Sequence, residues 1–198
     1  MTLLAVSKGH SVELIKQALA AGQKAFGENY VQEAVKKMDA LPAAEWHLIG
    51  PLQSNKTRIA AERFDWVQTL ASEKIAGRLS EQRPQHLPPL NVLIQVNVSA
   101  EASKSGVAMQ NASPLARAIS RMPRLCLRGL MAMPEPGAGR SRYQEVKRAF
   151  DSLKQEFGFD TLSMGMSDDL ELAIAEGATM VRVGTAIFGQ RKKEKSAA

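Results

Sequence analysis

Short apolar runs alternate with amphipathic segments along the chain, in the manner of strands followed by helices. The clearest strand pattern is 92–98, a nearly continuous apolar run of the kind found in buried parallel sheets. The clearest helix pattern is 142–157, where apolar residues recur along one stripe. The expected strands are 3–6, 24–26, 46–49, 66–69, 92–98, 125–131, 161–163 and 180–183. The expected helices are 12–21, 31–38, 56–63, 73–82, 114–122, 142–157 and 169–175.

Eight strands, of which all but the last are followed by a helix, predict an α/β fold with a single (β/α)8 TIM barrel. An open doubly wound sheet is the alternative, but eight regular units in 198 residues favour closure. Because no linker divides the chain, we expect one domain over 1–198, with a polar tail at 190–198. That tail is too short and hydrophilic for an eighth packing helix. We therefore expect either a truncated start, lacking a helix before the first strand, or an exposed patch between the first and last strands.

Composition narrows the classes of function. Apolar residues make up 44% of the chain and charged residues 23%, as in soluble globular proteins. Cys126 is the single cysteine, and the sequence shows neither a signal peptide nor a membrane-length apolar run, which together predict a cytoplasmic protein without membrane contact. The net charge of +6 is scattered and aromatics are only 5%, so nucleic-acid binding is not supported. We expect a monomer.

In a (β/α)8 barrel the chemistry lies at the carboxyl ends of the strands, which selects candidates directly. Lys8 follows the first strand, so its stem would begin among apolar walls that lower the pKa of an amine and suit it to form a Schiff base. The alternative is a surface lysine on the barrel rim. Arg182 is the odd residue in the apolar last strand, and if it points inward it needs an acceptor.

The loops after the last two strands are where such barrels often bind phosphate. Ser163–Ser167 (S-M-G-M-S) precedes the expected helix at 169–175, and Gly184-Thr185 follows the last strand. The alternative is that Ser167 is only a helix cap and the glycines only form turns. The three histidines are far apart in sequence, so a metal site is not expected, and neither a nucleophile elbow nor a glycine-rich nucleotide motif is present.

Five segments, read in order, resemble the YggS/PROSC family, the pyridoxal 5′-phosphate (PLP) homeostasis proteins. They are LAVSK (4–8), FGENY (26–30), HLIGPLQSNK (47–56), SMGMSDD (163–169) and RVGTAIFG (182–189). The resemblance runs from about residue 3 to residue 190. It implies a barrel like the N-terminal domain of alanine racemase, the fold type III architecture of PLP proteins.

The resemblance also implies roles for single residues. Lys8 would carry PLP as an internal aldimine, and Arg182 would face the pyridine nitrogen. The residues expected around the phosphate are Ser163, Gly165, Ser167, Gly184 and Thr185. Those expected to line the ring are Asn29, His47 and Asn97. Lys104 matches a second lysine near the cofactor mouth that is expected to assist PLP transfer.

Two departures from the family pattern stand out. Family members commonly have a second lysine two positions after the Schiff-base lysine, and His10 occupies that position here. The resemblance therefore implies no accessory role in PLP handling for this position. Members also usually carry a helical segment before the first strand, and its absence here agrees with the missing packing helix inferred above.

Two functions compete for such a site, and a third, a regulatory protein with PLP as a stabilising ligand, ranks below both. A PLP carrier or reservoir would hold the cofactor and pass it to apo-enzymes, whereas an amino-acid racemase would need an acid–base group on each face of the cofactor. Tyr30 and Tyr143 are the two tyrosines, and the second lies on a helix beside charged residues, a poor place for a base. A guanidinium at the pyridine nitrogen would also weaken the cofactor as an electron sink. We therefore predict a PLP carrier and not an enzyme.

Overall fold

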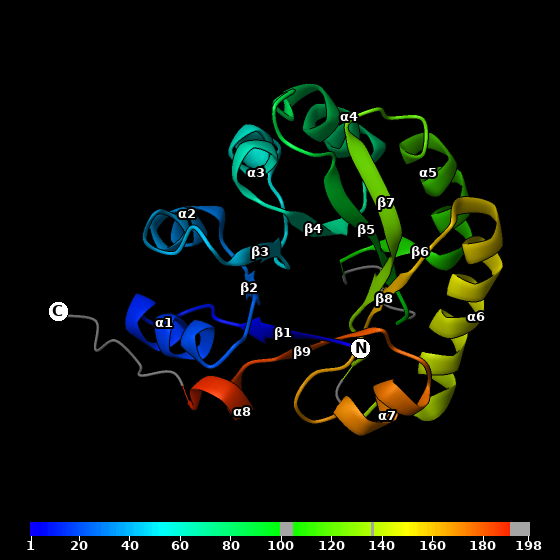
Figure 1. The fold of residues 1–198 in the computed structure, drawn as a ribbon. Helices are drawn as coiled ribbons and strands as arrows, with labels where there is room; N and C mark the ends of the chain where they lie inside the picture. The colour runs from blue at the N-terminus through cyan, green and yellow to red at the C-terminus, as the bar shows by residue number, and fades with distance from the viewer. Residues whose placement is uncertain (100–104, 136, 191–198) are drawn as a thin grey trace, which may run out of the picture.

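The structure, a computed structural model, describes residues 1–99, 105–135 and 137–190. Strands and helices alternate along the chain as the apolar pattern predicts (Figure 1). The strands are β1 (Thr2–Val6), β2 (Ala25–Glu28), β3 (Glu45–Leu48), β4 (Trp66–Leu70), β5 (Leu90–Asn97), β6 (Val107–Ala108), β7 (Leu125–Ala132), β8 (Thr161–Ser163) and β9 (Met180–Val183). The α-helices are α1 (Val12–Ala20), α2 (Val31–Ala40), α3 (Thr57–Arg63), α4 (Glu73–Gln82), α5 (Ala112–Ile119), α6 (Arg140–Phe157), α7 (Leu170–Ala175) and α8 (Thr185–Phe188).

Eight of the strands close into a parallel barrel, which confirms the predicted fold class. Their order is β4-β3-β2-β1-β9-β8-β7-β5, and β4 pairs with β5 to complete the ring. The first and last strands of the ring pair directly, from Thr2↔Met180 to Ala5↔Val183. The helices surround the strands on the outside (Figure 1). This arrangement gathers the carboxyl ends of all eight strands at one mouth.

Two short elements were not expected from the sequence. β6 pairs with the carboxyl end of β5 and is two residues long, too short for any apolar period to reveal. α8 is a four-residue helix that directly follows β9. The expected polar tail lies outside the described residues from 191 onward, and the extent of the single domain stays a prediction. In the described part of the chain, no helix is long and apolar enough to cross a membrane.

The two faces of the barrel strands differ in what they bury. Strand residues alternate between the faces, and every second one joins the large apolar core that also includes the helices, as Ala5, Phe26 and Leu48 do. On the other face, inside the barrel, the buried apolar residues form two small clusters. These are Leu4, Ala25, Ile49 and Met180 in one cluster, and Trp66, Leu93 and Met131 in another. Between them the interior is polar, and this polar interior leads to the candidate site.

Candidate functional site

Lys8 lies in the turn that follows β1, at the mouth of the barrel. Leu4 and Val6 pack in the interior cluster, and Lys8 follows two residues after Val6. Lys8 is partly buried. The backbone N–H of His10 donates to the Ser7 carbonyl at 3.1 Å and closes the turn around it. The position at the end of β1 therefore agrees with the expectation for the reactive lysine.

Arg182 projects into the barrel from β9 and is only 3% exposed. Its Nη1 donates to Ser163 Oγ at 2.8 Å and its Nη2 donates to the carbonyl of Ala132 at 2.9 Å. Burial lowers the pKa of the guanidinium to about 10, and the nearby Asp169 opposes the shift. Arg182 is thus still a cation at neutral pH, buried in the barrel interior and hydrogen-bonded to two acceptors.

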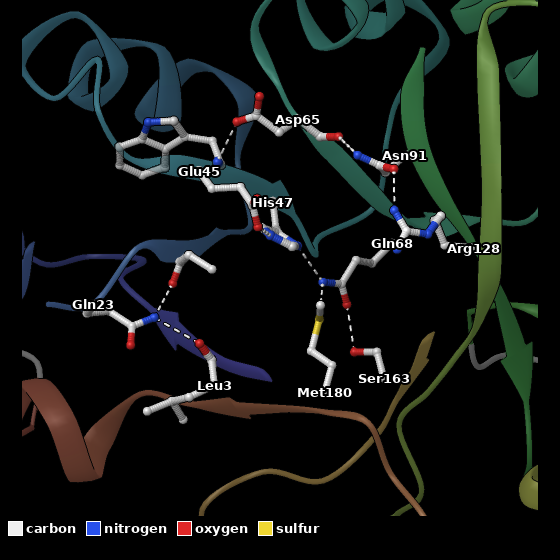
Figure 2. A network of polar contacts seen from close by, with 12 residues as sticks. Leu3, Gln23, Glu45, His47, Asp65, Gln68, Asn91, Arg128, Ser163 and Met180 are labelled. Atoms are coloured by element: carbon white, nitrogen blue, oxygen red, sulfur yellow. Dashed lines mark hydrogen bonds and ion pairs between the residues drawn. The ribbon is translucent and has the colours of Figure 1, made fainter. Parts of the chain in front are cut away.

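A run of side-chain hydrogen bonds continues from Arg182 across the barrel, and we name it the inner chain: Arg182, Ser163, Gln68, His47 and Glu45. The Ser163 hydroxyl donates to Gln68 Oε1 at 2.7 Å. Gln68 Nε2 lies 2.9 Å from His47 Nδ1, and His47 Nε2 lies 2.7 Å from Glu45 Oε1. Figure 2 shows Gln68 at the centre, between His47 and Ser163. Because an amide nitrogen only donates, His47 accepts at Nδ1 and carries its proton on Nε2. In every hydrogen bond of the inner chain, the donor is therefore the residue nearer Arg182 and the acceptor is the residue nearer Glu45.

The inner chain places two expected site residues deeper than their expected roles require. The Ser163 hydroxyl was expected at the phosphate, but it is fully buried between Gln68 and Arg182, which use its donor and one acceptor site. His47 was expected against the ring. It is fully buried too, stacks on Trp66 at 5.1 Å between centroids, and bonds to Gln68 and Glu45. Ser163 bonds directly to Arg182, and His47 is linked to it through Gln68 and Ser163. Gln68 was missed, although it is the one inward-facing polar residue of the buried strand β4.

The loops after β8 and β9 form a cradle at the mouth. Gly165 has φ +94°, and a Cβ there would lie 2.5 Å from that of Ala173, so only glycine fits. A Cβ on Gly184 would lie 3.3 Å from the Val6 carbonyl, which shows how closely this loop approaches the end of β1. Ser167 and Thr185 are exposed beside these glycines. The first turn of α8 also leaves backbone N–H groups without helical partners. Hydroxyls and free N–H groups of this kind are donors for a phosphate.

Asp169 holds the first of these loops in place. One of its carboxylate oxygens accepts the backbone N–H of Met166, and the other accepts the Tyr143 hydroxyl. Burial and this carboxylate raise the pKa of the Tyr143 hydroxyl far above its usual range. A cavity of about 520 Å³ lies on the α7 side of the loop, and Tyr143, Ser167 and Asp169 are among its lining residues.

The remaining expected residues lie around the mouth. Asn29 and Asn97, at the ends of β2 and β5, are both partly buried. The side-chain oxygen of Asn97 accepts from the backbone N–H and the hydroxyl of Ser99 at 3.0 and 2.9 Å. The backbone of Asn29 packs tightly against Gly50, where any Cβ would collide with it. Lys104 lies outside the described residues, so its expected role stays a prediction.

The donors at the mouth match the chemistry of PLP, which has an aldehyde, a pyridine ring and a phosphate. The strand ends supply a partly buried amine at Lys8, a buried cation at Arg182, and exposed hydroxyls at Ser167 and Thr185 beside closely packed glycine turns. Among the described residues, no group of three histidine, cysteine, aspartate or glutamate side chains could hold a metal ion. The residues present therefore fit the cofactor.

Comparison with known proteins defines the class of protein first. The alanine racemase N-terminal domain family matches residues 2–192, and the chain belongs to it. Solved alanine racemases share this fold at low sequence identity: one from Clostridium difficile is 10% identical with a TM-score of 0.81, and the chain covers 53% of it.

More similar relatives define the family more narrowly. A "pyridoxal phosphate homeostasis protein" of Escherichia coli K12 is 54% identical over 98% of this chain and 88% of its own length. A protein of the same name from Pseudomonas aeruginosa PAO1 is 56% identical over 96% of this chain and 84% of its own. PipY of Synechococcus elongatus PCC7942, solved with PLP bound, is 37% identical with a TM-score of 0.88, covering 96% of this chain and 92% of PipY. The chain belongs to the pyridoxal phosphate homeostasis protein family, which confirms the resemblance.

Proposed function

We propose that this protein binds PLP at the barrel mouth and serves PLP homeostasis, holding the cofactor rather than catalysing a reaction with it. The observation that carries the proposal is the meeting of Lys8 and the phosphate cradle at one strand junction. β1 pairs with β9, and Gly184 lies against the Val6 carbonyl, two residues before Lys8. An amine and an anion cradle at this separation suit a ligand with an aldehyde on one side and a phosphate on the other. The names of the relatives agree with this interpretation.

Each residue has a distinct role in this proposal. Lys8 provides the amine, and Arg182 presents its cation to the ring from below. The phosphate is held by Gly165, Ser167, Gly184 and Thr185. Asn29 and Asn97 border the ring at the mouth. When bound, PLP supplies a reactive aldehyde that joins reversibly to amines, so one lysine and one anion cradle suffice for storage and release.

The alternative, an amino-acid racemase, is less well supported by the geometry. A second acid–base group would have to face the ring opposite Lys8. The Tyr143 hydroxyl is buried, donates to Asp169, and has a pKa raised far above neutrality, so it does not serve as a base. Tyr30 is 63% exposed at the start of α2. The buried cation of Arg182 also favours an unprotonated pyridine nitrogen, which withdraws electrons weakly.

The first prediction concerns Lys8. The purified protein, mixed with PLP, should show the visible absorbance of a lysine-bound cofactor, and borohydride reduction followed by peptide mapping should place the cofactor on Lys8. Lys8→Ala should lose this absorbance while its melting temperature stays near that of the parent, because a partly buried rim lysine contributes little to packing. Lys16→Ala, an exposed lysine on α1, is the matched control and should bind normally.

Two outcomes would change the proposal. Binding that survives Lys8→Ala would contradict the assignment of the lysine. Racemisation of amino acids by the PLP-loaded protein, lost in Lys8→Ala, would favour the enzyme instead. We further propose that apo-enzymes accept PLP from this protein in the cytoplasm and that it acts as a monomer. Recovery of an apo-enzyme's activity from the loaded protein, and native mass spectrometry of the free protein, test these two points.

A further inference from the structure

A group of charged residues lies behind the turn that carries Lys8, on the outer side of the barrel wall. Glu28, Glu33 and Lys37 form this group, which we name the outer cluster. Glu28 ends β2 with its side chain on the face opposite the barrel interior, and Glu33 and Lys37 lie one turn apart on α2. The Lys37 side chain is 6% exposed and that of Glu28 is fully buried. Most of the other buried residues in this layer around the barrel are apolar.

Lys37 uses all three of its N–H donors inside the protein. Its Nζ donates to Glu28 Oε1 and Glu33 Oε1, each at 2.7 Å, and to the carbonyl oxygen of Ser7 at 2.8 Å. The Ser7 hydroxyl adds a further bond to Glu28 Oε1 at 2.6 Å. Glu28 is thus joined to the β1 turn both directly and through Lys37.

The outer cluster fixes the backbone on each side of Lys8. The Ser7 carbonyl belongs to the peptide group before Lys8, and it accepts from Lys37. The backbone N–H of Gly9 belongs to the peptide group after Lys8, and it donates to Glu33 Oε1 at 2.6 Å. Both peptide groups that flank the reactive lysine are therefore bonded to one small group of charges, which lies outside the barrel interior.

This arrangement is costly for stability, which argues for a use. Burial raises the pKa of the Glu28 carboxyl despite the neighbouring Lys37, because desolvation outweighs the attraction. The second Glu28 oxygen is buried without a hydrogen-bond partner among the described residues. A buried ion pair is often no more stable than apolar side chains of the same size in its place. The outer cluster is thus poorly explained by packing alone.

We propose that the outer cluster is a positioning device for Lys8: Lys37, supported by Glu28 and Glu33, holds the Ser7–Gly9 backbone so that the amine enters the barrel in a reactive orientation. The inference rests on the proposed function of Lys8. Its physical content is preorganisation, because a fixed backbone removes the need to order the turn when the cofactor arrives. Glu28, Glu33 and Lys37 touch neither the ring nor the phosphate positions described above.

The test uses two kinds of variant and two measurements. In Lys37→Met with Glu28→Leu, both buried charges are replaced by apolar groups, so the fold should survive with a melting temperature close to or above that of the parent. In Glu33→Ala, the Gly9 N–H loses its acceptor, whereas Glu33→Gln keeps an acceptor oxygen. Lys147→Met is the matched control, because Lys147 has an acid at the same helical spacing, Asp151 at 2.5 Å, on α6 across the barrel (Figure 1).

The two measurements are hydrogen exchange of the Gly9 amide in the cofactor-free protein and the rate at which added PLP becomes bound to Lys8. In the double variant and in Glu33→Ala, we expect the Gly9 amide to exchange faster and PLP to attach to Lys8 more slowly, each by roughly tenfold or more. Glu33→Gln should recover most of the difference, and Lys147→Met should match the parent.

Unchanged exchange and unchanged binding rate in Glu33→Ala would overturn the positioning role. The same result in a folded double variant would overturn it independently. If the double variant fails to fold, the comparison of Glu33→Ala with Glu33→Gln tests the positioning role by itself. Failure of the proposed function looks different, because the parent protein itself would then not attach PLP to Lys8. The exchange measurement needs no cofactor and keeps the inference testable even in that case.

Discussion

The inner chain and the outer cluster lie on opposite sides of the same barrel wall, and they treat buried charge in opposite ways. In the inner chain, the Arg182 cation is linked to the Glu45 carboxylate through three neutral side chains, Ser163, Gln68 and His47. In the outer cluster, the Lys37 cation touches two carboxylates directly. The first arrangement leaves the cation available to a ligand, because the side chain bonded to it is a neutral serine and not a carboxylate. In the second arrangement, all three N–H donors of Lys37 are already bonded within the protein.

The difference follows from what each network holds. A guanidinium that faces a cofactor has to keep both its charge and its position. A run of neutral side chains whose hydrogen bonds all point the same way stabilises the charge without placing a carboxylate against it. A backbone turn needs short, strong anchors, and charge-assisted hydrogen bonds supply them. The comparison teaches that buried polar groups near this site differ according to what they hold, with neutral relays inside the wall and ionic anchors outside it.

The largest expected effect comes from breaking the inner chain at its centre. Gln68→Leu leaves the Ser163 hydroxyl and His47 Nδ1 buried without their partner, and we expect a loss of about 2–4 kcal/mol in the free energy of unfolding. Urea denaturation measures it. Gln17→Leu, at an exposed position on α1, is the control and should change stability little. A Gln68→Leu protein as stable as the parent would show that the inner chain carries no energetic coupling.

A smaller effect is expected from pH, through His47. Burial lowers the pKa of His47 from its usual 6.5, and the neighbouring Glu45 and Asp65 only partly oppose this. Because the pKa is lower in the folded state, the unfolded chain binds the proton first. Stability that is present above about pH 6.5 is then lost as the pH falls. A protonated ring would also be unable to accept the Gln68 N–H.

Denaturation curves at several pH values measure this dependence. His47→Gln should flatten it below pH 6.5, since the titrating group is removed, whereas His86→Gln, at an exposed position, should leave it intact. An identical pH profile in the His47→Gln protein would contradict the neutral, proton-on-Nε2 state that the inner chain requires.

The smallest effect on stability is expected at the mouth, where neither network reaches. Ser167→Ala and Thr185→Val remove exposed hydroxyls and should change the free energy of unfolding by less than about 0.5 kcal/mol. Each should nevertheless weaken PLP retention by roughly tenfold, because in the proposed site each hydroxyl would donate one hydrogen bond to the phosphate. Equilibrium dialysis measures retention, with Ser141→Ala, on the exposed face of α6, as the control. Unchanged retention in both variants would place the phosphate elsewhere.

Much of the fold was predictable because its signals are local. Each barrel strand is an apolar run with polar ends, and closure follows from the number of units. Lys8, Gly165 and Gly184 could be selected by their place directly after strands. Ser163 was selected by the same reasoning and His47 by the family resemblance. Both side chains are hydrogen-bonded within the inner chain, and no local signal reports a contact over 95 residues such as Ser163 to Gln68.

The amino-acid sequence by itself determined the alternation of strands and helices, the barrel that they close, the family, and the strand ends where the candidate site lies. These features depend on periodicity and on short motifs, which are written along the chain. Only the tertiary structure decided which polar side chains meet: Gln68 with Ser163 and His47 inside the wall, and Lys37 with Glu28 and the Ser7 carbonyl outside it. The physical reason is burial. A polar group shut away from water must find a partner within about 3 Å, and that partner is set by strand register and helix packing rather than by distance along the chain.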